Sequence, residues 1–230
     1  NVSHEIRTPL TVLSGFVETM QTLPLDEEER QRFLALMSQQ ALRMQTLVND
    51  LLTLSRLEGS PAPGVSEWTD VREWMQHLVQ DARGLSAAIA DPVHDIALEE
   101  GPALQVAGSR SELYSAVSNL VSNAVRYTPP GGRIRAGWRS GPEGAFEFFV
   151  NDTGPGIASE HLPRLTERFY RVDRSRSRET GGTGLGLAIV KHVAQRHGGQ
   201  VYIRSTVGQG STFAISLPAS RLRPSASAVN

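Results

Sequence analysis

Apolar residues recur at steps of three and four residues along the first 54 positions of the chain, which is the period of an α-helix. A first helix is predicted over residues 1–22. Pro24 interrupts the pattern, and the acidic residues of 26–29 suit the first turn of a second helix because they complement its dipole. Within the second helix, the seam positions follow a heptad spacing: Phe33, Met37, Gln40, Met44, Leu47, Leu51 and Leu54. The pattern therefore predicts two helices joined by a short turn.

A single helical hairpin with one apolar seam cannot bury that seam by itself. We expect the hairpin of a second, identical subunit to cover it and complete a dimeric four-helix bundle. The alternative is that the hairpin packs against the rest of its own chain, and the sequence leaves this alternative open.

Prolines, glycines and serines interrupt the helical pattern at residues 59–66, where a linker that acts as a hinge is predicted. Residues 67–218 have a mixed pattern of helices and strands, so the chain is predicted to be α+β, with this domain following the hairpin of residues 1–58. Helices are predicted over 70–85, 109–128 and 184–197. Strands are predicted for "HDIALEE", "LQVAG" and two hairpins, "GRIRAGWRS" with "AFEFFVND" and "QVYIRSTV" with "STFAISLP". Residues 219–230 are small and polar, which predicts a disordered tail.

The composition narrows the functional classes. Of 230 residues, 39% are hydrophobic and 20% are charged, which is ordinary for a globular protein, and the net charge of −1 gives no support for nucleic-acid binding. The absence of cysteine excludes disulfides, thiolate metal sites and cysteine nucleophiles. No apolar run reaches the ~20 residues that span a bilayer. Because the chain lacks an initiator methionine and begins inside a helical pattern, we expect it to be a fragment of a longer protein.

Two glycine-rich segments, "DTGPGI" (152–157) and "GGTGLGLAIV" (181–190), could direct backbone N–H groups at an anion. The second is not a dinucleotide fingerprint, because polar "RSRSRET" precedes it and Arg204 stands where a ribose-binding acid belongs. The P-loop pattern and the H-R-D and D-F-G signatures of Ser/Thr kinases are absent from the sequence.

A third segment, "NLVSNAVRYTP", places Asn119 and Asn123 on one face of a predicted helix, with Arg126 and Tyr127 one turn further on. Amide oxygens beside a cation and an aromatic ring suit a site for a nucleotide and Mg²⁺. For this segment alone, two asparagines on a solvated helix face are an equally good interpretation.

The order of these segments resembles the sensor histidine kinases of two-component systems over residues 1–217. "SHEIRTPL" is similar to the H-box, "NLVSNAVRYTP" to the N-box, "DTGPGI" to the G1 box, "ERFYRVD" to the F-box and "GGTGLGL" to the G2 box. Two segments, "SHEIRTPLTVLSGFVETM" and "RFYRVDRSRSRETGGTGLGLAIVKH", are most similar to the phosphate-regulon sensor kinases of this family.

The resemblance implies a dimerisation and phosphotransfer hairpin followed by an ATP-binding α/β sandwich of the Bergerat type, shared with gyrase, Hsp90 and MutL. It implies ATP and Mg²⁺ as cofactors, a homodimer, and the receiver domain of a response regulator as partner. It also implies that the parent protein is anchored upstream in the bacterial inner membrane, with this portion on the cytoplasmic side.

In the H-box, the resemblance makes His4 the phosphoacceptor, and its imidazole must be neutral to attack phosphorus. Glu5 would take or orient the proton on the other ring nitrogen. Thr8 would position water for dephosphorylation of the regulator; the alternative is a hydroxyl that bonds the preceding helical turn. Pro9 has no N–H for the carbonyl of Glu5, so a kink is predicted just after His4.

In the second domain, the resemblance makes Asn123 the Mg²⁺ ligand, with Asn119 supporting it, and Asp152 the acceptor for the adenine amino group. Arg126 stands where the family commonly has lysine, so its contact with phosphate differs in geometry. The other residues implied to contact or shape the ATP site are Tyr127, Gly154, Gly156, Ile157, Phe169, Arg171, Gly182, Thr183, Gly184, Leu185 and Gly186. Arg174, Arg176 and Arg178 would close a lid over ATP, or form a solvated charged run.

Two other functions compete with a kinase. ATPases and chaperones of the same superfamily place a glutamate four residues before the metal-binding asparagine, and this chain has Asn119 there. A catalytically inactive ATP-binding scaffold would not need His4 and Glu5. We therefore predict a kinase that phosphorylates His4 from ATP, passes the phosphoryl group to an aspartate of a response regulator and acts on that regulator as a phosphatase.

Overall fold

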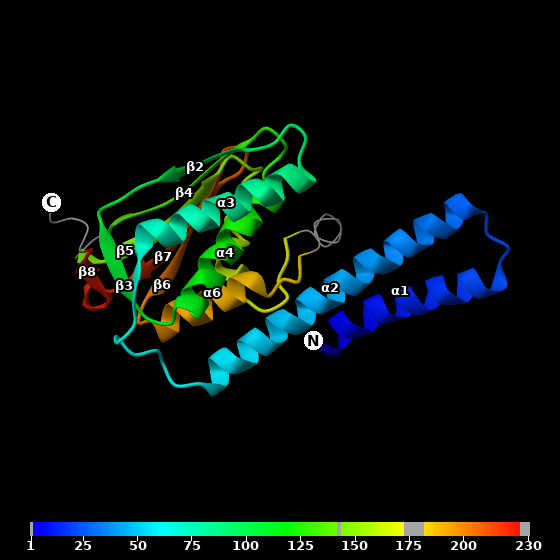
Figure 1. Cartoon of the computed structure of the whole chain (residues 1–230), viewed down its shortest axis with the longest axis horizontal. Helices are drawn as coiled ribbons and strands as arrows, with labels where there is room; N and C mark the ends of the chain where they lie inside the picture. The colour runs from blue at the N-terminus through cyan, green and yellow to red at the C-terminus, as the bar shows by residue number, and fades with distance from the viewer. Residues whose placement is uncertain (1, 142–143, 173–181, 226–230) are drawn as a thin grey trace.

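The computed structural model describes residues 2–141, 144–172 and 182–225, and Figure 1 shows a helical hairpin beside an α/β domain. The hairpin consists of α1 (Val2–Thr22) and α2 (Glu27–Gly59), as the apolar pattern predicted. Asp26 caps α2: its carboxylate accepts from the N–H of Glu29, and the Glu29 side chain accepts from the N–H of Asp26. Such a capping box typically stabilises a helix start by about 1 kcal/mol.

Pro9 lies inside α1 and is buried, and the helix continues through it to Thr22. The structure therefore shows that the proline does not end the helix. The kink predicted after His4 stays a prediction.

The α/β domain is built on a five-stranded sheet with the order β2-β4-β5-β7-β6. Its strands are β2 (Asp95–Glu99), β4 (Arg133–Ser140), β5 (Phe146–Asp152), β6 (Gln200–Thr206) and β7 (Gly210–Leu217). β2 and β4 are parallel, and the other neighbours are antiparallel, so both predicted hairpins are confirmed.

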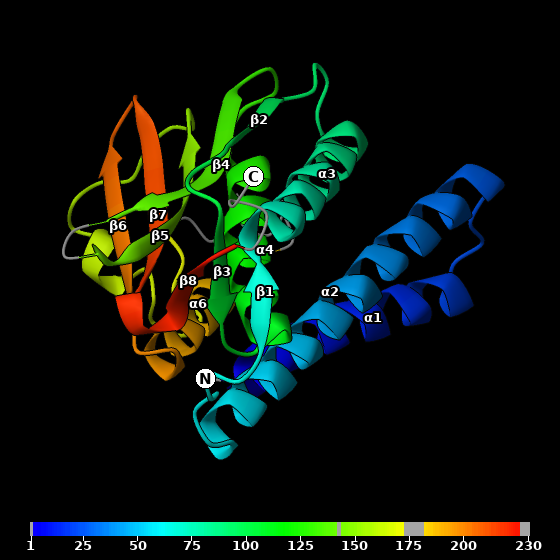
Figure 2. The same ribbon diagram turned by 60° about the vertical axis from the view of Figure 1, so that its left-hand side comes forward.

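Three helices cover one face of this sheet, namely α3 (Val71–Ile89), α4 (Arg110–Tyr127) and α6 (Gly186–Arg196), and they lie between the sheet and the hairpin (Figure 2). Aromatic side chains fill the core between the layers. The ring of Trp74 meets Phe148 edge-on with centroids 4.8 Å apart, and Phe148 meets Phe146 at 4.6 Å. Such contacts add to the stabilisation that burial of the rings provides.

The prediction of a disordered tail from residue 219 is wrong for residues 219–225. A 3₁₀ turn (Ala219–Arg221) leads into β8 (Leu222–Pro224), which pairs with β3 (Leu104–Ala107), and β3 pairs with β1 (Trp68–Asp70), a strand that the sequence did not indicate. Side-chain contacts hold β8: the Arg223 guanidinium lies 4.2 Å from the centroid of the Trp68 ring, and the Ser225 hydroxyl donates to Asp70 at 2.5 Å. These contacts are long-range, so composition could not reveal them. Residues 226–230 lie outside the described part of the chain.

The hairpin also packs against its own α/β domain, the alternative that the sequence left open. The C-terminal half of α2 contacts α6, and Leu47, Leu54 and Leu57 are buried. Other apolar side chains of the hairpin stay exposed in the single chain: Val2, Leu10, Val12, Val17, Leu23, Leu34, Leu42, Val48 and Leu52. Packing within one chain therefore covers part of the apolar surface of the hairpin and leaves a further part for another molecule.

Candidate nucleotide and phosphotransfer site

The two predicted asparagines lie on the face of helix α4 that points away from the hydrophobic core. Its core face is buried against the sheet, whereas Asn119 and Asn123 are half-buried. The side-chain N–H₂ of Asn119 donates to the Ser115 carbonyl at 2.8 Å, which fixes the orientation of the amide. Its Oδ1 faces the start of α6, because a Cβ atom at Gly186 would lie 2.5 Å from that oxygen. The structure thus brings the N-box and the G2 box together, and any side chain at Gly186 would displace Asn119.

Asp152 ends β5 and begins the G1 box. Burial raises the pKa of the Asp152 carboxyl, while hydrogen bonds from the backbone N–H groups of Gly154 and Ser211 oppose this shift by favouring the ionised form. Gly156 has a φ of +72°, and a Cβ there would lie 2.1 Å from the Thr206 carbonyl oxygen, so this position requires glycine. The carboxylate is therefore held at the edge of the site by a turn of fixed shape.

Tyr127 connects the G1 and G2 segments. Cβ atoms built at Gly154 and at Gly182 would each lie 3.3 Å from Tyr127, from its carbonyl oxygen and from its hydroxyl respectively. The same tyrosine therefore lies beside both glycine-rich loops, and the N-box, G1 and G2 residues form one site. The N–H of Ile157, at the end of G1, donates to the Ser205 hydroxyl at 2.8 Å, which ties the G1 turn to β6.

The F-box contacts the G2 box through the backbone. The N–H of Phe169 donates to the Gly184 carbonyl at 2.8 Å, and Phe169 itself has a φ of +62°. A positive φ at a non-glycine residue costs about 1–3 kcal/mol and is held in place by the surrounding contacts. The predicted lid arginines Arg174, Arg176 and Arg178 lie outside the described residues.

The H-box approaches this loop through Glu5, while His4 is exposed. The Glu5 carboxylate lies 3.8 Å from the Arg171 guanidinium, and the Thr183 hydroxyl donates to Asp50 of α2 at 2.6 Å. Leu185 follows Thr183, and its N–H donates to that same hydroxyl at 3.2 Å. The hairpin and the loop that carries F-box and G2 residues therefore touch at Glu5, the residue next to the predicted phosphoacceptor, and at Asp50.

The Thr8 hydroxyl donates to the His4 carbonyl at 3.0 Å. This is the back-bond that was the alternative interpretation of Thr8, and its proposed part in dephosphorylation stays a prediction. A small cavity beside these residues is lined by Glu5, Pro9, Arg171 and Thr183, among others. Pro9 therefore belongs to the surface where the hairpin meets the loop.

Mg²⁺ would have to be held mainly by amide and phosphate oxygens. Among the residues described, no group of three or more His, Cys, Asp or Glu side chains could hold a metal ion. The side-chain nitrogen of Asn119 donates to the Ser115 carbonyl, so the amide oxygen of Asn119 faces the site. Mg²⁺ binds through few protein ligands and the phosphates of a nucleotide, so the residues fit this ion.

Two contacts of the site could not be found from the sequence. His94 is buried; its Nε2–H donates to the Thr128 carbonyl at 2.9 Å, and its Nδ1 accepts from Ser86 at 2.8 Å, which secures the end of α4 just after Tyr127. Burial raises the pKa of Asp50, and the bond from Thr183 opposes that shift. Neither residue lies in a recognisable motif.

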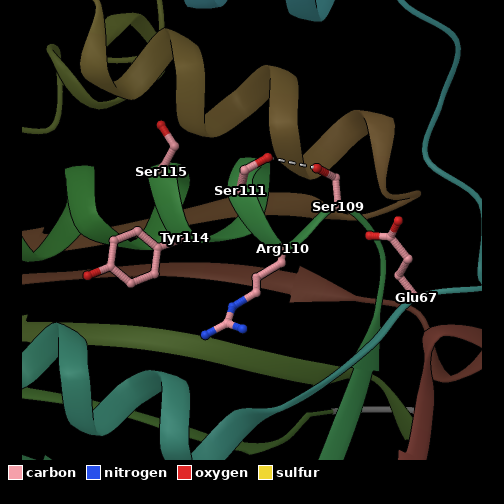
Figure 3. Close-up of a pocket in the computed structure, with 6 residues that line it drawn as sticks. All are labelled: Glu67, Ser109, Arg110, Ser111, Tyr114 and Ser115. Carbon is pink, nitrogen blue, oxygen red and sulfur yellow. Dashed lines mark hydrogen bonds between the residues drawn. The ribbon is translucent and has the colours of Figure 1, made fainter.

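The open hollow in Figure 3 lies at the other end of α4 and is lined by Glu67, Ser109, Arg110, Ser111, Tyr114 and Ser115. None of these residues is among those predicted to contact the nucleotide. The hollow is therefore separate from the site described above, although it is wider than the cavity beside Glu5.

Two family models match the chain. Residues 1–60 match the His Kinase A (phospho-acceptor) domain, and residues 108–221 match the histidine kinase-, DNA gyrase B-, and HSP90-like ATPase. In the part of the chain that the structure describes, no helix is long and apolar enough to cross a membrane.

Known proteins agree with these matches. The phosphate regulon sensor protein PhoR of Pseudomonas aeruginosa is 52% identical over 214 residues, which are 93% of this chain and 47% of PhoR, so the chain spans about half of that relative. The solved structure of the mycobacterial sensor histidine kinase MprB is 30% identical in sequence and has a TM-score of 0.58. The match covers 69% of this chain and 99% of the MprB chain. The histidine kinase ThkA, solved with the response regulator protein TrrA, shares the fold with a TM-score of 0.73 at 21% identity, over 95% of this chain and 60% of its own. The chain therefore belongs to the sensor histidine kinases, with a phospho-acceptor hairpin followed by an ATP-binding α/β domain.

Proposed function

We propose that this chain transfers the γ-phosphoryl group of ATP to His4 and then to an aspartate of a response regulator. One observation carries the proposal: the N-box, G1, F-box and G2 residues converge on one site, and that site touches the phospho-acceptor hairpin at Glu5. A scaffold that merely binds ATP would need no such contact with the H-box.

The nucleotide is held by residues from both sides of the site. Asp152 accepts a hydrogen bond from the adenine amino group, and the turn at Gly154 and Gly156 lets the backbone approach the base. Mg²⁺, bound by Asn123 with Asn119 nearby, would neutralise charge on the phosphates. Arg126 and Arg171 contact phosphate oxygens.

The chemical step needs a neutral imidazole. A ring nitrogen of His4 forms a bond to the γ-phosphorus as the bond from that phosphorus to the β–γ bridging oxygen breaks and ADP leaves. Glu5 takes the proton from the other ring nitrogen. Because Glu5 lies 3.8 Å from Arg171 in the structure, this ion pair has to loosen before Glu5 can turn to the imidazole. Exposure of His4 then leaves the phosphoryl group accessible to the aspartate of the regulator.

The proposed assembly is a homodimer formed through the exposed apolar residues of the hairpin. The 52% identity with PhoR supports phosphate-starvation sensing as the physiological role, with Thr8 serving a phosphatase reaction on the regulator. The resemblance supports a parent protein anchored in the inner membrane with this portion in the cytoplasm.

Labelling with γ-³²P-ATP tests the reaction. We expect acid-labile, base-stable label on the intact chain and none on the His4→Gln variant, while the His77→Gln variant, changed at an exposed histidine on α3, labels normally. Asp152→Asn should lose both nucleotide binding and label. Label that persists on His4→Gln would overturn the proposal. Release of phosphate from ATP without labelled protein would indicate an ATPase, and binding of ATP with neither result would indicate a scaffold.

A further inference from the structure

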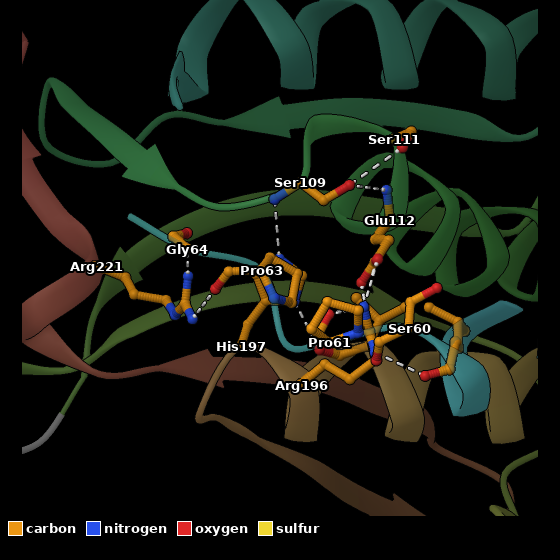
Figure 4. A network of polar contacts seen from close by, with 12 residues as sticks. Ser60, Pro61, Pro63, Gly64, Ser109, Ser111, Glu112, Arg196, His197 and Arg221 are labelled. Atoms are coloured by element: carbon orange, nitrogen blue, oxygen red, sulfur yellow. Dashed lines mark hydrogen bonds and ion pairs between the residues drawn. The ribbon is translucent and has the colours of Figure 1, made fainter. Parts of the chain in front are cut away.

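The linker after α2 is held by two arginines of the ATP-binding domain, which Figure 4 shows from close by. Arg196, in the last turn of α6, donates from Nη1 to the carbonyls of Leu57 and Ser60, both at 2.7 Å, and from Nη2 to the Pro61 carbonyl at 2.8 Å. Its Nε–H and the second N–H of Nη2 donate to the two carboxylate oxygens of Glu112, at 3.0 Å each. All five N–H donors of one guanidinium are therefore used.

The contact is also largely shielded from water. The side chain of Arg196 is 12% exposed and that of Glu112 is 20% exposed. Charge-assisted hydrogen bonds in such surroundings are stronger than those of an exposed ion pair. A lysine at this position would retain the charge but present a single nitrogen, which cannot reach three carbonyls and a carboxylate together.

A second arginine holds the next part of the linker. Arg221 donates from Nη2 to the Pro63 carbonyl at 2.8 Å and from Nη1 to the carbonyls of Gly64 and Ala107, at 3.1 and 3.2 Å. The composition of residues 59–66 predicted a hinge, yet four of the linker carbonyls accept bonds from these two guanidinium groups. The linker follows the surface of the ATP-binding domain.

The held linker is connected directly to the helices that carry the nucleotide residues. Glu112 lies in the first turn of α4, two turns before Asn119, and Arg196 ends the helix that begins at the G2 box. Next to Arg196, the buried His197 joins the same two helices: its Nδ1–H donates to the Val193 carbonyl at 2.8 Å, and its Nε2 accepts from the Ser109 N–H at 3.2 Å. The end of α2, the linker, α4 and α6 therefore form one connected unit.

We propose that Arg196, held by Glu112, is a positioning residue for phosphoryl transfer to His4. By fixing the linker it limits the orientations that the ATP site can take relative to the hairpin, and so raises the effective concentration of the bound nucleotide at the phosphoacceptor. The proposal rests on the proposed function above. Arg196 lies at the end of α6 away from the G2 box, so its effect is on the transfer step and not on nucleotide affinity.

The test measures two quantities on the full chain. In Arg196→Ala we expect the autophosphorylation rate at saturating ATP to fall by about tenfold or more, with the dissociation constant for ATP unchanged within about twofold. Amide hydrogen exchange of residues 59–66 should accelerate in this variant, while exchange around Asn123 stays as in the intact chain. Arg204→Ala, at an exposed arginine on β6, serves as the control and should change neither quantity.

Glu112→Gln is the second variant, because it retains the side-chain shape and removes the charge that holds Arg196; we expect a smaller loss of rate in the same direction. An unchanged or increased rate in Arg196→Ala, or a loss of ATP affinity as large as the loss of rate, would overturn the proposal. If Arg196→Ala does not fold, the autophosphorylation rate and the dissociation constant for ATP of Glu112→Gln test the proposal in its place. Failure of the intact chain to label His4 would refute the proposed function instead, and the hydrogen exchange would still report whether Arg196 holds the linker.

Discussion

The two parts of the molecule obtain their stability differently. In the α/β domain, Trp74, Phe146 and Phe148 are enclosed between the sheet and its helices. Among the described residues of the hairpin, the buried side chains are Pro9, Leu47, Leu54 and Leu57, and several large apolar side chains face solvent. The α/β domain thus has a core of its own, whereas the hairpin is buried only where it packs on the ATP-binding domain and leaves large apolar side chains exposed.

This difference suits the proposed reaction. A site that must hold a nucleotide in one geometry benefits from a rigid, fully packed support. A phosphoacceptor that must meet first the ATP site and then a regulator benefits from contacts that can be exchanged one at a time, such as Glu5 with Arg171 and Thr183 with Asp50.

The largest expected effect comes from the core of the α/β domain. Phe148→Ala removes a ring that contacts both Trp74 and Phe146, and should lower the free energy of unfolding by about 3–5 kcal/mol. Leu42→Ala in the hairpin, at a side chain that is 62% exposed, should change it by less than about 0.5 kcal/mol in the monomer. Urea denaturation at protein concentrations below the dimer range measures both. Equal losses would show that the two parts do not differ as described.

An intermediate effect is expected on assembly. Val17→Glu places a charge among the exposed apolar residues of the hairpin and should raise the dissociation constant of the dimer about tenfold or more, because burial of such a side chain stabilises by about 1.5–3 kcal/mol. Val207→Glu, at a side chain that is 65% exposed in the α/β domain, should leave it unchanged. Sedimentation equilibrium gives both constants. If Val17→Glu dimerises as tightly as the intact chain, the exposed residues of the hairpin do not form the interface.

The smallest effect is a dependence of stability on pH. Burial lowers the pKa of His197 below its usual value, so the unfolded chain takes up this proton at a higher pH than the folded chain. The associated stability is fully present above pH about 6.5 and is lost as the pH falls below that value toward the folded pKa. The urea concentration at the midpoint of unfolding should therefore decrease as the pH is lowered from 8 to 5.

The pKa of His192 is lowered too, mainly by burial, and contributes with the same sign, so His192→Gln separates the two groups. The fall of the midpoint on acidification should be smaller in His197→Gln than in the intact chain, and an equal fall in both would contradict the assignment to His197.

Much of the fold could be predicted because the signals are local. The heptad seam and the acidic first turn of α2 predicted the hairpin, and the strand-like segments on either side of the glycine-containing turns at 141–144 and 208–210 predicted both strand hairpins. Strands β1 and β8 could not be predicted, because each is three residues long and is held by distant partners, such as Asp70 for Ser225. The linker was mispredicted for the same reason. Its composition indicates a flexible hinge, but its backbone carbonyls accept hydrogen bonds from Arg196 and Arg221, which lie more than 130 residues further along the chain.

For the site, the order of five motifs predicted the residue set, and the structure brings most of its members together through Tyr127, Gly186 and Phe169. It could not be predicted that the H-box meets the loop through Glu5 or that Asp50 bonds Thr183. Those contacts depend on how the hairpin packs on the α/β domain, and no local pattern encodes that arrangement.

Mapping the phosphoryl group on the protein tests the central claim most directly. After incubation with Mg²⁺ and ATP, tandem mass spectrometry under neutral conditions that preserve phosphohistidine should find one phosphoryl group per labelled chain. The account predicts that this group is on His4 and on none of the other five of the six histidines. A phosphoryl group on another residue, or an unmodified His4 in a chain shown to bind ATP, would contradict it.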